Sequence, residues 1–348
     1  MMFRNLYKLT TTNGTSGDEY NVAKIIIDIV EKIGLVHQTD KLGNVTVYKP
    51  TSHSPESAKT IMLCAHMDEV GFIITDITAG GYLKFQPVGG IDARILPAKR
   101  VTVGKAQIHG TITSKAHHLS KNAHTAPDYD VLAIDIGARN REDAEKSVSK
   151  GDYAYFLSDF TEFGGISHDV GKAPMLKAKA LDDRVSCGIM LELMEEDYPV
   201  NVYFAFTVQE ESGCRGAKVI THGKNIDNCI VLEGTTCADF IDIQKGGFST
   251  ILGDGVAISI LDSGSYSNKE LVQVLTDTAT RNNIKFQYKR TTKGGNDASA
   301  IHIAKNGIKT AVLSVPCRYI HSPSSICAKS DIYSCLELTK AFLMRELS

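Results

Sequence analysis

Two adjacent carboxylates, Glu210 and Glu211, follow the apolar run 202–208 and precede a glycine-containing turn. The run is typical of a buried strand, so the pair is predicted at the carboxyl edge of a sheet, where α/β proteins place their sites. Two carboxylates side by side repel each other and resist joint ionisation unless a cation or a shared proton compensates. Taken alone, such a pair is more often a solvated strand end. The function therefore depends on whether the chain supplies a cation.

Four further groups carry similar side chains, and nearly all of them lie at or just after an apolar strand: His66 with Asp68, Asp182 with Asp183, Glu233, and His321. In a mainly parallel sheet such strand ends converge on one edge. Histidines and carboxylates gathered there suit Zn²⁺, Mn²⁺ or Co²⁺. Their number exceeds what one tetrahedral ion uses, which predicts a two-metal site with ions about 3.5–4 Å apart.

Reach and spacing suggest roles for two carboxylates of this set. A carboxylate shared by two ions needs short reach and rigid placement, which favours Asp182 over a glutamate. Asp68, two residues after His66, fits a carboxylate that orients a ligating imidazole. Each piece alone has a plainer interpretation, because a single histidine after a strand is more often structural and Asp-Asp-Arg is typically a helix cap. Their joint occurrence favours a metal centre.

The elements that must position these residues have an α/β pattern at both ends of the chain. A capping-box pattern at 16–19 and apolar residues at helical spacing predict a helix ending near residue 33. Strands are predicted at 45–48, 60–65, 202–208, 229–232, 256–261 and 310–315, and helices at 185–194, 269–281 and 331–347. Between about 70 and 163, short β-type runs with glycine turns predict a small barrel or sandwich, with one clear helix near 141–149.

The simplest architecture is an α/β/α sandwich with a mixed sheet, interrupted by a β-rich insertion. Its domains are then 1–69 with 164–348, and the insertion 70–163. The segment 115–129, with His117, His118 and His124, is expected to be a polar loop whose histidines are solvated.

The composition is that of an ordinary globular protein, with 43% hydrophobic and 22% charged residues among 348. A formal net charge of −2 argues against nucleic acid or an anionic membrane as the main partner. No apolar run approaches the roughly 20 residues that span a bilayer, and the start lacks the apolar core of a signal peptide. Eight cysteines without paired C-x-x-C spacing favour a reducing, cytoplasmic location.

Six motifs, in order over nearly the whole chain, resemble the cytosolic co-catalytic metallo-aminopeptidases. This is the TET-type or glutamyl-aminopeptidase family (peptidase family M42), some of whose members carry a cellulase label. The motifs lie at Ala65–Phe72, Lys179–Arg184, Thr207–Ala217, Leu232–Thr235, Gly294–Ala298 and Val315–Pro323. One departure is Asn296, where relatives often have threonine; asparagine keeps the capacity to form hydrogen bonds.

The resemblance implies a zinc-peptidase-like catalytic domain and a role for each residue. One metal would be bound by His66 and Glu233, the other by Glu211 and His321, with Asp182 bridging, Glu210 as general base and Asp68 supporting His66. It further implies two divalent ions per subunit, Zn²⁺ or Co²⁺ first and Mn²⁺ as an alternative. The insertion would be a dimerisation domain, and dimers would assemble into a tetrahedral dodecamer.

The expected activity is removal of N-terminal residues from peptides by a metal-activated water. The alternatives are an amide deacylase or carboxypeptidase-type hydrolase on the same scaffold, or a non-catalytic metal-stabilised binding protein. A glycosidase would use two carboxylates without a metal, and the absence of tryptophan weakens that interpretation. The specificity pocket is expected from Asp262–Tyr266, Arg318–Ile320 and the insertion, with the preferred residue left open.

Overall fold

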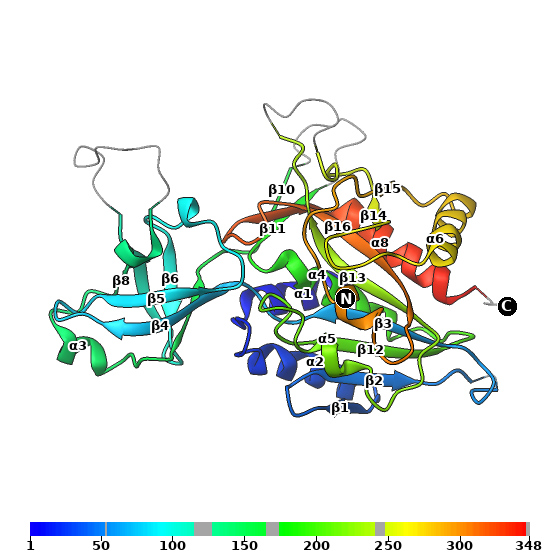
Figure 1. The fold of residues 1–348 in the computed structure, drawn as a ribbon, viewed down its shortest axis with the longest axis horizontal. Helices are drawn as coiled ribbons and strands as arrows, with labels where there is room; N and C mark the ends of the chain where they lie inside the picture. Colours follow the sequence, from blue (N-terminus) through cyan, green and yellow to red (C-terminus); the bar gives the residue numbers. More distant parts are fainter. Residues whose placement is uncertain (53, 115–126, 165–173, 241–247, 346–348) are drawn as a thin grey trace.

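The protein is described here from a computed structural model that covers residues 1–52, 54–114, 127–164, 174–240 and 248–345 (Figure 1). The segment 115–126, which holds the three loop histidines of the sequence analysis, lies outside the described residues. Over the described chain, a large mixed sheet and a separate closed barrel account for the strands. No helix in these ranges combines the length and apolar character that crossing a membrane requires.

Four parallel strands form the centre of the large sheet. They are β12 (Asn201–Thr207), β3 (Thr60–His66), β13 (Asn228–Thr236) and β16 (Lys309–Arg318), adjacent in that order. Beside β12 the sheet continues with β2 (Val45–Lys49) and β1 (His37–Thr39). Beside β16 it continues with β17 (Ser325–Ala328), β11 (Met175–Ala178) and β10 (Thr161–Phe163). Strand β14 (Val256–Ser259) also pairs with β16, and β15 (Phe286–Tyr288) pairs with β14. Because the central strands run in parallel, their carboxyl ends meet along one edge.

Helices cover both faces of this sheet, since alternate side chains of the central strands enter different cores. In β3, Ile61 and Leu63 belong to the larger core, whereas Met62 and Cys64 face the smaller one. The larger core is closed by α1 (Met2–Thr11), α2 (Tyr20–Lys32), α4 (Leu181–Leu193), α6 (Lys269–Arg281) and α8 (Lys329–Leu343), the smaller by α5 (Ala217–Ile220) and α7 (Ala298–Ile301). The predicted sandwich is confirmed.

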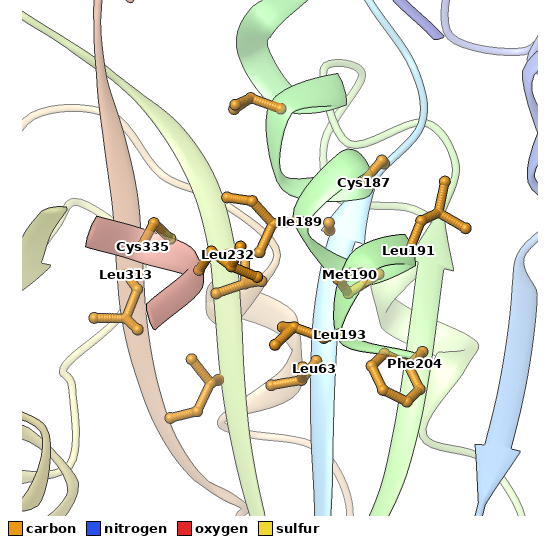
Figure 2. Close-up of a cluster of buried hydrophobic side chains, with 14 of the residues drawn as sticks. Leu63, Cys187, Ile189, Met190, Leu191, Leu193, Phe204, Leu232, Leu313 and Cys335 are labelled. Carbon is orange, nitrogen blue, oxygen red and sulfur yellow. The ribbon is translucent and has the colours of Figure 1, made fainter. Parts of the chain in front are cut away.

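Helix α4 lies at the centre of the larger core. Figure 2 shows its side chains packed against those of the sheet strands, with Leu63, Phe204 and Leu232 from three of the strands. Twelve of its thirteen residues are buried, including the charged residues of its first turn, Asp182, Asp183 and Arg184. A charged helix start is expensive to bury unless it has partners. The packing therefore fixes the acidic start of α4 rigidly below the carboxyl edge of the sheet.

The β-rich insertion folds as a closed barrel with its own core. Strands β4 (Gly71–Ile77), β5 (Leu83–Val88), β8 (Ile134–Asp135), β7 (Ile108–Ile112), β6 (Arg100–Val103) and β9 (Tyr153–Phe156) close in that order. Phe72 packs edge-to-face against Phe85 and Phe156, with ring centroids 4.9 and 5.1 Å apart. In Figure 1 the barrel stands to the side of the large sheet, with the short helix α3 (Arg141–Glu145) at its outer end.

Some local elements differ from expectation. The capping box does not form: the Ser16 hydroxyl donates to Asp68, and Glu19 accepts the backbone N–H groups of Gly17 and Gln209. Helix α2 consequently starts at Tyr20 without a side-chain cap. The amphipathic helix α1 was not predicted, because only a few apolar residues, such as Leu6 and Leu9, carry its buried face.

Candidate metal centre

The predicted site residues converge at the carboxyl edge of the central strands. His66 ends β3 and pairs in register with Thr207, the last residue of β12. Glu210 and Glu211 follow that strand, and Glu233 lies within the carboxyl half of β13. Asp182 comes from the start of α4, and His321 from the loop after β16. Segments more than 100 residues apart therefore supply one site.

Asp182 lies between the two histidines and offers one oxygen to each. Its Oδ1 is 3.4 Å from Nε2 of His66, and its Oδ2 is 3.4 Å from Nε2 of His321. The first imidazole is also 3.3 Å from Oε1 of Glu233, and the second 3.2 Å from Oε1 of Glu211. Two groups of three potential ligand atoms thus share the Asp182 carboxylate, and in each group all the atoms lie within 4.8 Å of one another.

Both imidazoles are held through their Nδ1 atoms, which leaves Nε2 facing the carboxylates. Nδ1 of His66 is 3.1 Å from the carbonyl oxygen of Asp68. Nδ1 of His321 is 2.7 Å from the carbonyl oxygen of Gly90, in the segment after β5 of the barrel insertion. Hydrogen bonding at the second ring nitrogen fixes the tautomer and orientation of a ligating histidine. The barrel insertion therefore helps to build the centre.

The fully buried Asp68 carboxylate organises the acidic turn after β12. Its two oxygens accept the backbone N–H groups of Glu210 and Glu211, at 3.0 Å each, and the Ser16 hydroxyl donates to it at 2.5 Å. The turn begins with Gln209 in a left-handed conformation at φ 57°. A non-glycine residue adopts this conformation at an energetic cost. Residues held in it are concentrated at functional sites. His321 shares it, at φ 58°.

Glu210 lies outside the two ligand groups that share Asp182, although it also comes within 4.8 Å of His66 and Glu211. Its Oε2 is 3.8 Å from Nε2 of His66, farther than the atoms of Asp182 and Glu233. Its Oε1 accepts a hydrogen bond from the Cys214 thiol at 3.4 Å. A carboxylate beside the ligands and outside the closest set is placed to handle a proton.

Burial and mutual repulsion shift the pKa values of these groups. Burial raises the pKa of Glu233 to about 8 and that of Glu210 well above its usual range. Burial alone would lower the pKa of His321, but the adjacent Asp182 and Glu211 carboxylates raise it to about 11. Carboxylates outnumber histidines, so the site carries an excess of buried negative charge that needs a cation.

The donor set fits metal ions. Oδ1 of Asp182 is buried and has no hydrogen-bond partner among the described residues, and buried polar atoms are rarely left so. Two imidazoles and three carboxylates, His66, His321, Asp182, Glu211 and Glu233, form the two groups that share Asp182. Such mixed nitrogen and oxygen donors suit first-row divalent cations.

The centre opens into a cleft of about 1490 Å³. Tyr319 and Ile320 line it as expected, and residues 90–99 of the insertion contribute, but the predicted Asp262–Tyr266 segment does not. The Asp262 carboxylate instead accepts hydrogen bonds from the backbone N–H groups of Gly264 and Ser265 in its own turn, and from the side chain of Asn296. Asn296 lines the cleft in its place, and its Oδ1 also accepts the N–H of Ala298.

Several buried polar residues around the centre were not assigned roles from the sequence. Asp183, joined to Asp182 by a cis peptide bond, accepts the backbone N–H of His66 at 3.2 Å. Lys179 and Glu69 form a buried ion pair at 2.6 Å. These residues all belong to the motifs at Ala65–Phe72 and Lys179–Arg184. Their positions in the sequence do not indicate which residues pair with one another. Only the fold brings Lys179 to Glu69 across more than 100 residues.

The sandwich, the inserted barrel and the carboxylate-linked histidine pair together define a metallopeptidase-type hydrolase. A family model described as M42 glutamyl aminopeptidase matches residues 43–338. The chain belongs to this family, and it is a peptidase with the aminopeptidase activity of that class.

Relatives and solved structures are similar to this chain along nearly its whole length. A putative aminopeptidase of Acetivibrio thermocellus is 32% identical over 339 residues, 97% of each chain. A lysyl aminopeptidase of Pyrococcus furiosus is 30% identical, covering 97% of this chain and 95% of its own. The structure of an aminopeptidase from Desulfurococcus kamchatkensis matches with a TM-score of 0.91 at 32% identity, over 99% of this chain and 94% of that one. The Pyrococcus horikoshii TET1 peptidase, which can assemble into a tetrahedron or a large octahedral shell, matches with a TM-score of 0.84 at 31% identity, over 99% and 100%.

Proposed function

We propose that the chain removes N-terminal residues from peptides with two divalent cations at the shared Asp182 carboxylate. The supporting observation is that Asp182 offers one oxygen to each of two histidine–carboxylate groups. His66 and Glu233 would complete the first group, and His321 and Glu211 the second. When bound, the cations supply a Lewis acid for the scissile carbonyl and lower the pKa of the attacking water.

Glu210 is the general base of the proposed reaction. Its Oε2 faces the ligand groups without belonging to the closest set. It takes the proton of the attacking water and later passes it to the nitrogen of the leaving amine. Burial raises its pKa, which suits a group that must both accept and release a proton near neutral pH.

Asp68 acts as a positioning residue. It holds the backbone of Glu210 and Glu211 and lies against Nδ1 of His66, with Oδ1 at 3.4 Å. A free substrate amine recognised by a cation or an acidic side chain would restrict cleavage to the N-terminal residue. A blocked amine would lose that contact.

The remaining parts of the proposal concern metal, assembly and location. Zn²⁺ or Co²⁺ are the preferred cations and Mn²⁺ the alternative. Residues 70–163 are proposed as a dimerisation domain, with 1–69 and 164–348 as the catalytic domain, and dimers assemble into a tetrahedral dodecamer. The similarity to the TET1 peptidase supports this assembly. A cytoplasmic location is supported by eight cysteines that are all free.

Aminoacyl-anilides and matched N-blocked peptides test the function directly. The enzyme is stripped with a chelator and reloaded with Zn²⁺, Co²⁺ or Mn²⁺. Loss of activity on chelation, recovery on reloading and rejection of N-blocked substrates would support an aminopeptidase. Cleavage of blocked substrates would favour a deacylase or carboxypeptidase-type hydrolase. Metal binding without turnover of any substrate would favour a binding protein.

A further inference from the structure

Cys214 lies in the cleft beside the proposed base and differs from the other cysteines. The remaining seven are buried, whereas Cys214 is only partly buried and lines the cleft. Its Sγ is 3.4 Å from Oε1 of Glu210, and the Ser299 hydroxyl donates to the same sulfur at 3.5 Å. The residue has a left-handed conformation, at φ 53°. The acidic turn thus holds a thiol against the carboxylate that the proposed reaction needs.

Asp297 lies next to this pair and has one oxygen without a partner in the described part of the chain. Its side chain is buried, with only 1% of the residue exposed. The Thr207 hydroxyl donates to Oδ2, and the Cys64 thiol lies 3.7 Å from the same oxygen. Oδ1 is also buried and has no hydrogen-bond partner in the described part of the chain. A buried carboxylate oxygen left in this way calls for a cation, a water or a proton.

Cys214, Glu210 and Asp297 each place one ligand atom within 4.8 Å of the other two. Zinc binds sulfur at about 2.3 Å and carboxylate oxygen at about 2.0–2.2 Å. Three atoms so close can surround one ion after small side-chain rotations, and the Cys214 thiol releases its proton to solvent when the ion binds. We propose that these three residues form a third cation site, distinct from the two at Asp182, that selects thiophilic ions such as Zn²⁺.

Occupation of this site would inhibit the enzyme. Glu210 presents Oε2 to His66 and Oε1 to Cys214, so one carboxylate faces both places. A cation on Oε1 stabilises the ionised form and withdraws its negative charge, so that Oε2 no longer accepts a proton from water. The consequence rests on the proposed function, because it requires Glu210 to be the base. The site itself does not.

Ion identity follows from the ligands. A thiolate favours Zn²⁺ and Cd²⁺ over Mn²⁺ and Mg²⁺, which prefer oxygen. The two groups around Asp182 contain no sulfur. Zinc in excess of two equivalents is therefore expected to inhibit, whereas the same excess of Mn²⁺ is not.

The direct test is a Cd²⁺ titration of Mn²⁺-loaded enzyme, followed by ultraviolet thiolate-to-metal charge-transfer absorption. Wild type should show this band with one saturating equivalent, and Cys214→Ser should lack it. Asp297→Asn should weaken Cd²⁺ binding, while Cys335→Ala, at a buried cysteine of α8, serves as the matched control and should keep the band. Absence of the band in wild type, or its persistence in Cys214→Ser, would overturn the site.

The second test compares turnover with and without excess Zn²⁺ within each variant. In wild type, excess Zn²⁺ should reduce turnover by about 10²-fold or more, the contribution of a general base. Cys214→Ser should keep most of its own two-equivalent activity under the same excess. Equal inhibition of both would overturn the regulatory consequence. If metal-loaded wild type cleaves no aminoacyl-anilide, the proposed function fails, whereas the Cd²⁺ band still decides the site.

Discussion

Asp68 accepts the backbone N–H of Glu210 through Oδ1 at 3.0 Å, which ties the end of β3 to the acidic turn after β12. Its other oxygen accepts the N–H of Glu211 at the same distance. One buried carboxylate therefore sets the position of both the proposed base and a proposed ligand.

Asp68→Asn should weaken metal binding by about 10–100-fold, the usual effect of losing a group that orients ligands. The two backbone N–H groups reach different oxygens of Asp68, and asparagine in the same position would turn an N–H₂ donor toward one of them. Competition with a chromophoric chelator would measure the affinity. Asp76→Asn, on the barrel strand β4 beside Lys150, is the matched control and should bind metal as wild type does. Equal affinities for Asp68→Asn and wild type would contradict the assignment.

Glu210→Gln and Glu211→Ala should separate proton transfer from metal binding. Glu210→Gln should keep its metal content and lose turnover by about 10²–10⁴-fold or more, because an amide does not accept the water proton. Glu211→Ala should lose metal, since it removes the Oε1 atom 3.2 Å from His321. Metal analysis beside anilide hydrolysis would decide both. An active Glu210→Gln enzyme would exclude it as the base.

Gly234→Ala should displace Asp182 and reduce metal binding. A Cβ at position 234 would stand 2.9 Å from Cα of Asp182, a backbone atom that the buried start of α4 holds in place. Gly188→Ala, within α4, is the control, because its added methyl meets Leu6 at an ordinary 3.7 Å. Metal content and thermal unfolding should show loss in the first variant alone. Similar metal content in both would show that the contact can relax.

Asp331 should make stability depend on pH away from the metal centre. Burial raises its pKa to about 6, although the N–H groups of Gly253 and Gly255 act in the opposite direction. The folded protein holds this proton more tightly than the unfolded chain, so the contribution is complete below the unfolded value of 3.8 and is lost as pH rises towards 6.

Asp331→Asn has no carboxyl group to titrate there and should remove that loss. Between about pH 4 and about pH 7, the free energy of unfolding of wild type should therefore fall relative to the variant by about 2–3 kcal/mol. Urea unfolding of the metal-free proteins at both pH values measures the difference. Because all other titrating groups are common to the two proteins, parallel pH dependences would show that Asp331 is not responsible.

Residue types and their order along the chain already determined much of this protein. Apolar runs ending in His66, Glu210 and Glu233 predicted strand ends with ligating side chains, because a parallel sheet gathers such ends at one edge. The helix predicted at about 269–281 matches α6, Lys269–Arg281. Short runs separated by glycines predicted a small barrel or sandwich, and the structure forms the barrel. These features depend on local patterns, which a single sequence carries.

The tertiary structure decided what depends on distances between remote segments. It placed the Asp182 oxygens against two histidines, brought the Gly90 carbonyl of the insertion to His321, and set Asp297 beside Cys214. No spacing in the chain encodes these contacts, because they arise from strand order and from the packing of α4 beneath the sheet. The sequence by itself determined which side chains could do the chemistry. Only the packed fold decided which atoms of those side chains face one another.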